Sequence, residues 1–563
     1  MGMKKTVTVI VAIIAIFTLF ATGAYAERGR DGELKLIYWQ APSIINPYLS
    51  GGTKDNHAAA VVVEPLANYL PSGEMVPTLA KSIPKPAADL KSITWELKPG
   101  VVWSDGTPFT ADDVVFTAKY CMDPAGGCSQ LPFFKDVESV ERVDDLTVKI
   151  NFGVPKPFPY GPFVGSQVPV LQKKQFQNCL GAKAPTCTDA NFGPIGTGAF
   201  KVSEFHPNDT VIYVMNEKFR DPNKPAFSKV MIKGGGDAAS AARSVLETGE
   251  FDFAWNLQVE PEVLAKMEKV GKGKIVASFG TGVERLMVNL TNPDPKLGDK
   301  RATKAHPHPF LSDLAVRRAL SLAIDRQILV DVGYGAAGRA TCNVLSGPEI
   351  YASSANEECK TQNIELANKI LDEAGWKRGS DGVRAKNGVR LSILYQTSTN
   401  SVRQATQAMI KQMWQQIGVE TELKNISASV FFGGDQASPD TYQKFFADIE
   451  MYTNTFNGTD PETYMNNWKC TEAPAPENQW IGNNMPRYCD PEYDALLVEM
   501  SKTAVLEERI AIAKKLNDKL MQAYAMIPLI HRGDVNAWKN SIGGYKASPW
   551  DAYLADIEDW YRK

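Results

Sequence analysis

Eight cysteines carry the most evident chemistry in this sequence, and two kinds of site could use them. Disulfide bonds are one, because an even number of cysteines in an exported protein favours them. A metal site is the other, but the chain has no Cys-x-x-Cys and its five histidines show no ligand spacing with the cysteines. We therefore expect disulfides and no metal. Sequential pairing is the simplest of the many possible connectivities, and it would join Cys121 to Cys128, Cys179 to Cys187, Cys342 to Cys359, and Cys470 to Cys489.

Side chains that could perform hydrolysis are present, but they lack the spacing that hydrolysis requires. Adjacent carboxylates occur at Asp112-Asp113 and at Glu357-Glu358, where helix starts or the surface explain them better than acid–base catalysis. The chain has no Gly-x-Ser-x-Gly, no His-Glu-x-x-His and no Cys/His nucleophile in a convincing context. A secreted hydrolase is therefore the least favoured interpretation, and we expect no enzyme activity and no cofactor.

The glycine-rich segment Gly193–Gly198 could be taken for a phosphate-binding loop. It lacks the Lys-Ser/Thr pair of a P-loop, and it leads into an apolar strand pattern where a P-loop leads into a helix. We expect a structural turn here and no phosphate site.

The first residues indicate export. Met1–Lys5 carries two lysines and no acid, Thr6–Phe20 is almost wholly apolar or β-branched, and Ala24-Tyr25-Ala26 is a small-x-small cleavage site. This pattern predicts a signal peptide that is cleaved after Ala26. An uncleaved membrane anchor is the alternative, but the apolar run has about 15 residues and a span needs roughly 20. No cysteine lies near the cleavage site, so we expect a free periplasmic protein without a lipid anchor.

Length and charge narrow the class of protein. A chain of 563 residues is too long for one hydrophobic core, which suggests two to four domains. The formal net charge of −3 and the absence of a basic run make nucleic acid an unnatural partner. Nothing in the sequence calls for an oligomer, and we expect a monomer.

The elements that must position a site alternate between strands and helices. Apolar patterns predict helices at His57–Leu70 and over Leu314–Gly333, and a hairpin between Phe200–Phe205 and Thr210–Met215. The stretch from Leu391 to Leu423 reads as strand, helix and strand, which implies a sheet with parallel pairing.

The most characteristic segment is Trp95–Tyr120, WELKPGVVWSDGTPFTADDVVFTAKY. It reads as a strand, two turns and a helix. Thr110 is a candidate N-cap, and Asp112 and Asp113 stand in the first helical turn, where acidic groups suit the helix dipole.

This segment resembles the signature of the family 5 extracellular solute-binding proteins, which include the dipeptide- and oligopeptide-binding proteins of ABC importers. Four further segments resemble elements of that family in the same order: PIGTGAF from Pro194, SVLETGEFDFAW from Ser244, PFLSDLAVRRALSLAIDR from Pro309, and ELANKILDEAG from Glu365. The resemblance covers the chain from about Leu34 to about Gly544.

The resemblance implies an α/β, two-lobed periplasmic-binding-protein fold (type II) with an extra domain inserted in lobe one. Lobe one would comprise residues 27–68, 194–291 and 534–563, the inserted domain residues 69–193, and lobe two residues 292–533, after a signal peptide at 1–26. Hinges would lie at about Asn289–Pro293 and near His531–Asp534.

The resemblance also implies where a ligand binds. In the peptide-binding relatives, an aspartate four residues before a proline pairs with the ammonium group of the peptide. Anchoring on Pro461 puts Asn457 at that position, which brings no charge, so Asp460 or Glu462 could substitute or the ligand could lack a free amine. The expected ligand-facing residues are those of this segment and those that end two strands: Tyr452, Thr453, Asn454, Asn457, Asp460, Trp39, Tyr395 and Gln396.

The function implied is that of a periplasmic receptor. It would enclose a small-molecule ligand between its lobes and deliver it to the permease subunits of an ABC transporter. The ligand would be a di- or oligopeptide. An oligosaccharide, an opine or another polar molecule is the alternative.

Overall fold

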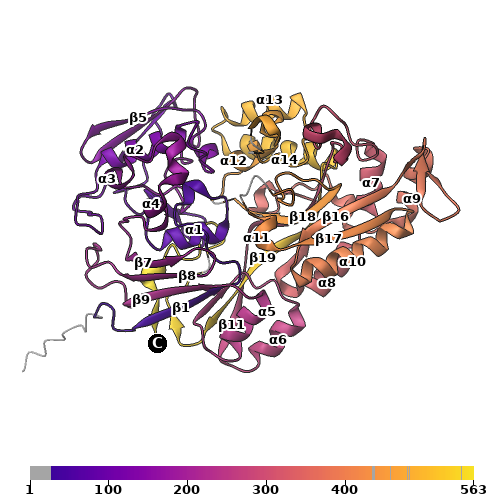
Figure 1. The fold of residues 1–563 in the computed structure, drawn as a ribbon. Coiled ribbons are helices and arrows are strands. Elements are labelled where there is room, and N and C mark those ends of the chain that lie inside the picture. The colour runs from indigo at the N-terminus through magenta and orange to yellow at the C-terminus, as the bar shows by residue number, and fades with distance from the viewer. Residues whose placement is uncertain (1–26, 434–437, 457, 479, 481, 547) are drawn as a thin grey trace, which may run out of the picture.

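A mixed β-sheet runs through the centre of the molecule and joins its two lobes (Figure 1). The structure is a computed structural model, and it describes residues 27–433, 438–456, 458–478, 480, 482–546 and 548–563. The strands of this sheet lie in the order β17-β16-β18-β11-β19-β10-β1-β9-β8-β7, and β12 also pairs with β19. Their bounds are β1 Glu33–Tyr38, β7 Phe200–His206, β8 Thr210–Met215, β9 Lys229–Gly234, β10 Phe253–Trp255, β11 Gly273–Val288, β12 Gly338–Ala340, β16 Ser392–Ser398, β17 Glu420–Ile426, β18 Ile449–Asn454 and β19 Met526–Lys539.

Helices cover both faces of the sheet in each lobe (Figure 1). Their bounds are α1 Thr53–Ala60, α2 Ala111–Met122, α3 Lys173–Phe176, α4 Thr188–Phe192, α5 Ala238–Leu246, α6 Pro261–Glu268, α7 Leu314–Leu322, α8 Arg326–Gly333, α9 Ile364–Glu373, α10 Ser401–Gln416, α11 Ala428–Phe431, α12 Glu462–Met465, α13 Pro491–Met500 and α14 Leu506–Gln522. In lobe two, α7 to α10 pack on one face of the sheet, while α12, α13 and α14 pack on the other. In lobe one, α5 and α6 cover one face, and α1 with the C-terminal segment covers the other.

The remaining strands are short. Their bounds are β2 Ala67–Tyr69, β3 Met75–Pro77, β4 Ser92–Glu96, β5 Val137–Asp144, β6 Thr147–Phe152, β13 Lys377–Arg378, β14 Arg384–Lys386, β15 Val389–Arg390, β20 Ile542–Gly543 and β21 Tyr561–Arg562.

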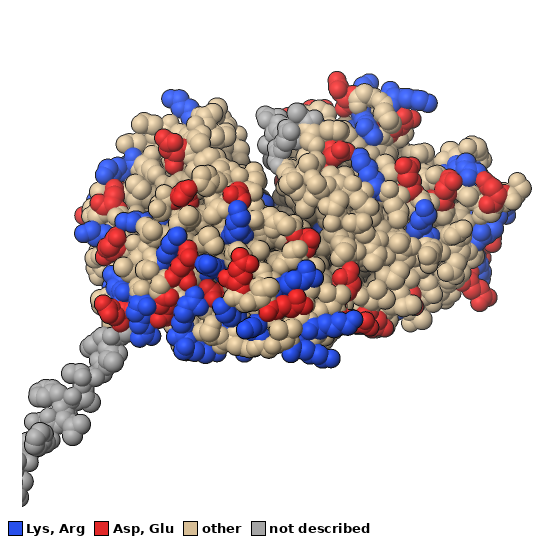
Figure 2. Space-filling model, turned by 60° about the horizontal axis from the view of Figure 1, so that its bottom comes forward, with Lys and Arg blue, Asp and Glu red and all other residues tan. Residues whose placement is uncertain are grey.

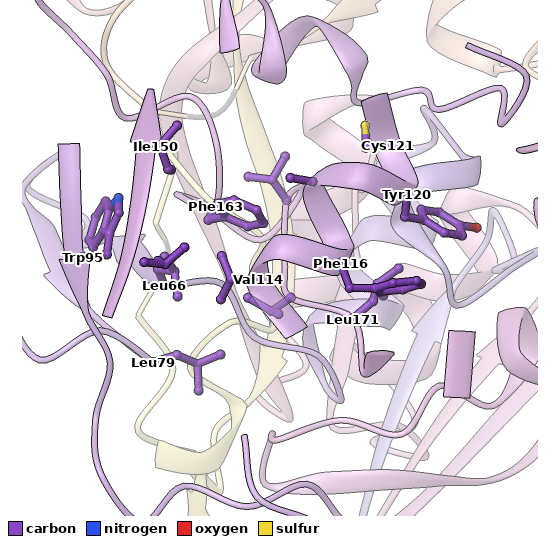
Figure 3. Packing of buried hydrophobic residues seen from close by; sticks show 14 of the residues in the cluster. Leu66, Leu79, Trp95, Val114, Phe116, Tyr120, Cys121, Ile150, Phe163 and Leu171 are labelled. Carbon is purple, nitrogen blue, oxygen red and sulfur yellow. The ribbon is translucent and has the colours of Figure 1, made fainter. Parts of the chain in front are cut away.

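The segment between β2 and α4 folds around a core of its own. The antiparallel sheet β4-β6-β5 and helix α2 enclose a cluster that includes Trp95, Val114, Ile150 and Phe163 (Figure 3). Helix α2 starts where the sequence predicts it, because Thr110 and Asp113 form a reciprocal capping box. The signature segment therefore has a structural role: it builds this core. Asp551 ties the unit to lobe one by accepting hydrogen bonds from the backbone N–H groups of Tyr69 and Ser166.

Other local predictions are confirmed. β7 and β8 form the expected hairpin, with Phe200 opposite Met215. β16 and β17, which are connected by α10 in the sequence, pair in parallel in the sheet. All four disulfides join sequential cysteines, as in the simplest arrangement: Cys121–Cys128, Cys179–Cys187, Cys342–Cys359 and Cys470–Cys489.

Two helix predictions are wrong in extent. Helix α1 ends at Ala60, ahead of Pro65, which could not lie inside a helix, and the chain re-forms as strand β2. The helix predicted over Leu314–Gly333 is two helices. Asp325 separates them by capping α8 through a hydrogen bond from the N–H of Ile328 (3.1 Å).

The glycine-rich segment Gly193–Gly198 serves close packing, as its sequence context suggests. A Cβ at Gly196 would lie 1.8 Å from the carbonyl oxygen of Val62, so only glycine fits against that backbone. In the part of the chain that the structure describes, no helix is both long and apolar enough to cross a bilayer. The expected signal peptide, residues 1–26, lies outside that part.

Candidate functional site

Strands β11 and β19 are the two long strands that pass from one lobe into the other. They pair antiparallel from Gly273 opposite Lys539 to Phe279 opposite Gly533, and again from Val283 opposite His531. The regular pairing is interrupted between Phe279 and Val283. Strand β10 flanks β19 on the lobe-one side, and β18 flanks β11 on the lobe-two side. The lobes therefore meet at residues 280–282 and 531–533.

Tight packing shapes this junction. A Cβ on Gly280 would lie 2.4 Å from the carbonyl oxygen of Pro549, so the chain passes there only as glycine. The imidazole Nε2 of His531 lies 2.9 Å from the carbonyl oxygen of Gly280. Burial lowers the pKa of His531, so at neutral pH the uncharged ring donates this hydrogen bond.

A buried polar cluster centred on Glu284 lies beside the junction. The carboxylate accepts two hydrogen bonds from Arg403 (2.9 and 3.2 Å) and one from the hydroxyl of Thr453 (2.6 Å). Gln258 and Tyr334 donate to it at 3.3 and 3.2 Å. Burial alone would raise the pKa of this carboxyl, but the attraction of Arg403 outweighs burial and the pKa lies below its ordinary value. Glu284 is therefore a buried, charged and fully hydrogen-bonded group.

Arg532 joins the same cluster from β19. Its guanidinium donates to the side-chain oxygen of Asn256 and lies 3.5 Å from the hydroxyl of Thr453. The indole N–H of Trp39 donates to the backbone oxygen of Asn256 (2.8 Å). Trp39, Asn256 and Gln258 come from lobe one, whereas Arg403 and Thr453 come from lobe two. The cluster therefore joins side chains of both lobes at the place where the lobes meet.

A cavity of about 140 Å³ lies between the inserted domain and lobe two, and Asn454, the residue after Thr453 in β18, belongs to its lining. Aromatic rings, prolines and asparagines dominate its wall, and two cross-domain contacts flank it. The ammonium of Lys156 lies 2.7 Å from the carboxylate of Glu462, and that of Lys135 lies 2.6 Å from the amide oxygen of Asn466. The lining residues include Tyr69, Phe133, Phe152, Phe158, Tyr160, Asn454, Thr455, Phe456, Asp460, Tyr464 and Asn467.

The structure brings four of the sequence-predicted ligand residues to this region. Trp39 and Thr453 belong to the polar cluster, and Asn454 and Asp460 line the cavity. Asp460 is already engaged, because Arg509 forms a bidentate ion pair with it at 2.7 Å. Its charge is therefore compensated within lobe two.

The other predicted residues lie inside lobe two. Tyr395 and Tyr452 are buried in its two hydrophobic cores, and Gln396 donates to the buried carboxylate of Glu450 (3.0 Å). Asn457 lies outside the described residues.

Sequence reasoning missed Asn256, Gln258, Glu284, Arg403 and Arg532. A signal was available for two of them. Glu284 and Arg532 are charged residues next to apolar runs in β11 and β19, and a buried charge requires partners. The other three lack a local signal, because loop and helix polar residues are usually solvated.

Charges at the surface do not single out another site on the face that Figure 2 shows. Lys/Arg and Asp/Glu side chains are interspersed over it. Within the described residues, no group of three or more His, Cys, Asp and Glu side chains could hold a metal ion.

Comparisons with known proteins agree with this architecture. Residues 74–474 match the model of the bacterial extracellular solute-binding proteins, family 5 (middle). That family consists of binding proteins and not of enzymes. Protein XP55 of Streptomyces lividans is 28% identical over 387 residues, which cover 68% of this chain and 65% of that protein. The periplasmic oligopeptide-binding protein OppA of Haemophilus influenzae is 22% identical, over 92% of this chain and 91% of its own.

Among solved structures, the oligopeptide-binding protein AppA of Bacillus subtilis, in complex with a nonapeptide, has the same fold. It superposes with a TM-score of 0.80 at 22% identity, over 95% of this chain and all of the other.

Proposed function

This chain belongs to the family 5 bacterial extracellular solute-binding proteins, and from that premise we propose that it is the receptor of an ABC importer. It captures a peptide between its two lobes and presents it to the permease subunits in the membrane. The fold is the two-lobed α/β fold of type II periplasmic binding proteins. The peptide as ligand class is supported by relatives that are named for oligopeptide binding.

One observation carries this proposal: a buried polar cluster is built from both lobes at the place where, among the described strands, β11 and β19 cross between them. Rotation about residues 280–282 and 531–533 would open and close the space beside that cluster. We place the end of lobe one's second segment at these residues in preference to residue 291, because Leu286 and Val288 pack in the core of lobe two. The other lobe boundaries, at 68, 193 and 533, stay as proposed.

The proposal also covers where the protein is located and what happens to the ligand. The family is periplasmic or extracellular, and an export signal at 1–26 that is cleaved after Ala26 would deliver this chain as a free monomer to the periplasm. The ligand leaves unchanged, since a receptor binds and releases without chemistry.

A second candidate is the same receptor with a polar non-peptide ligand, such as an opine or an oligosaccharide. The ion pair between Asp460 and Arg509 favours it. A carboxylate that is already neutralised is a poor partner for a peptide ammonium group, and Glu462 is likewise held by Lys156 and Arg509.

A thermal-shift screen of residues 27–563 tests both candidates. The panel contains di- and tripeptides, longer peptides, N-acetylated peptides and oligosaccharides. A ligand at 100 times its Kd adds about 2.7 kcal/mol to the free energy of unfolding, which is a visible shift in Tm. Stabilisation by peptides supports the first candidate. Stabilisation by other polar molecules alone would replace it with the second.

A further inference from the structure

A loop of the C-terminal segment, residues 548–552, is fixed to the inserted domain. Asp551 accepts a hydrogen bond from the backbone N–H of Tyr69 (3.1 Å). The indole N–H of Trp550 donates to the backbone oxygen of Pro71 (3.1 Å). The loop therefore holds its position relative to the turn between β2 and β3, which belongs to the inserted domain.

The same loop contacts the junction of the lobes and also lobe two. At the junction, the backbone of Pro549 lies so close to Gly280 that a Cβ there would be 2.4 Å from its carbonyl oxygen. The carbonyl oxygen of Trp550 accepts a hydrogen bond from the N–H of Gly458 in lobe two (2.8 Å). Rotation of lobe two about residues 280–282 would therefore make or break this hydrogen bond.

Gly458 and Thr459 form the tip of the segment between β18 and α12, and this tip fits closely against the other parts of the molecule. A Cβ on Gly458 would lie 2.8 Å from ring atoms of Tyr69, and a Cβ on Gly73 would lie 2.9 Å from the methyl group of Thr459 and 3.7 Å from the indole nitrogen of Trp550. Both glycines have positive φ, so their backbones approach the tip and its surroundings as only glycine allows. We call Tyr69, Gly73 and Trp550 the seat of the tip.

The start of the same segment is tied to the junction. The hydroxyl of Thr281 donates to the carbonyl oxygen of Phe456 and accepts from its N–H, both at 2.9 Å. Asn454 and Asp460, which line the cavity, belong to this stretch of lobe two. The junction and the seat therefore position residues that line the cavity.

The contact between tip and seat is small enough to break. Among the described groups, it is made by one backbone hydrogen bond and by the packing of one methyl group and one ring. Neighbouring contacts between the inserted domain and lobe two are polar: Lys156–Glu462 and Lys135–Asn466. They involve α12 and the residues after it, on the side of lobe two that faces the inserted domain (Figure 1). Small, polar contacts between domains favour relative movement.

We propose that seating of the tip positions the ligand-facing segment of lobe two and holds the molecule in its closed form. Tyr69, Gly73 and Trp550 are then positioning residues, which act on a ligand through this segment. The inference rests on the lobe movement of the proposed receptor function. It does not depend on the class of ligand, so its tests use ligand-free protein.

A larger side chain at the tip is the first test. Thr459→Phe does not fit the seat, because the methyl group of Thr459 already lies against Gly73. The radius of gyration of the ligand-free protein, from small-angle X-ray scattering, should increase while Tm stays close to that of wild type. The matched control is Thr361→Phe, which places the same ring at an exposed position before α9 and should change neither quantity. A lower Tm with the radius of gyration of wild type would make the contact a permanent interface and overturn the proposal, as would no change in either quantity.

A cross-link tests the same contact without enlarging the tip. Gly73→Cys combined with Thr459→Cys should form a disulfide in addition to the four native ones, because the two Cβ atoms can come within the roughly 3.5–4.5 Å that a disulfide spans. The cross-link should slow hydrogen exchange of the Gly458 amide about 10-fold or more relative to the same protein before oxidation. Failure of the disulfide to form, or unchanged exchange of this amide, would refute the proposal.

The outcomes separate the two proposals. If peptides bind in the screen but T459F keeps the radius of gyration of wild type, the receptor function stands and the role of the seat is refuted. If T459F opens the ligand-free protein but the screen finds no ligand, the role of the seat stands and the receptor function fails.

Discussion

The contact between Lys156 and Glu462 links the inserted domain to lobe two, and removing it should open the molecule. Glu462 begins α12, and its carboxylate lies 2.7 Å from the ammonium of Lys156 and 3.1 Å from the guanidinium of Arg509. The side chains of Lys156 and Glu462 are only 11% and 7% exposed. The change to make is Glu462→Gln, which keeps the shape of the side chain and removes its charge.

The magnitude follows from the geometry. At an effective dielectric constant of about 20, charges 2.7 Å apart attract by about 6 kcal/mol. Most of this is offset, because Lys156 keeps Asp136 at 2.9 Å and Arg509 keeps Asp460 at 2.7 Å. We expect a net loss of about 1.5–3 kcal/mol, at or below the lower end of the cost of breaking a buried pair.

Of the two contacts that Glu462 makes, the one to Lys156 joins the inserted domain to lobe two and the one to Arg509 stays within lobe two. The loss therefore falls on the arrangement in which these domains are in contact. A loss of this size shifts the equilibrium between closed and open forms by about 10- to 100-fold, and ligand affinity falls by up to the same factor. The radius of gyration of the ligand-free protein, from small-angle X-ray scattering, should increase.

The matched control is Glu492→Gln, whose side chain is 81% exposed in lobe two and pairs with Lys519. It should change neither quantity. If E462Q is folded and has the affinity and radius of gyration of wild type, the assignment of this contact to domain closure is refuted.

Three further predictions concern stability. Replacing Cys342 and Cys359 by serine opens a loop of 17 residues and should lower the free energy of unfolding by about 3 kcal/mol in urea titrations; a change below about 1 kcal/mol would contradict this. Burial lowers the pKa of His57 in the folded protein to about 3. As the pH falls from 6.5 towards 3, the imidazole becomes protonated in the unfolded chain and stays neutral in the folded one, so the free energy of unfolding decreases. His57→Gln should remove this contribution, which amounts to about 1.4 kcal/mol of unfolding free energy per pH unit. If the free energies of unfolding of wild type and H57Q fall in parallel over this pH range, the prediction is refuted. Gly196→Ala should cost about 3 kcal/mol through its clash with backbone, whereas Gly51→Ala, with open space around it, should change Tm little; equal shifts would show that the packing argument fails.

The sequence predicted well those features that depend on neighbouring residues. The capping box of Thr110 and Asp113, the hairpin of β7 and β8 and the sequential disulfides each form between groups close along the chain. It predicted helix extents less well, because α1 ends at Ala60 and because Asp325 starts a second helix within an apolar pattern. Apolar periodicity alone does not register such single-residue breaks.

The candidate site divides in the same way. Trp39 and Thr453 could be proposed from their places at strand ends, and the structure puts both into the cluster where the lobes meet. Tyr395 and Tyr452 occupy comparable positions, but they point into the cores of lobe two. Whether a residue at a strand end faces the junction of the lobes or a hydrophobic core depends on how the helices pack on the two faces of the sheet.

The sequence by itself determined the family and the local elements of this protein, because each is encoded in continuous stretches of residues. Only the tertiary structure decided the composition of the polar cluster. Glu284, Arg403 and Arg532 come from β11, α10 and β19, and no spacing along the chain relates them. Burial removes the water that would otherwise solvate these charges, so each group is stabilised only by the hydrogen-bond and ion-pair partners that the fold places beside it.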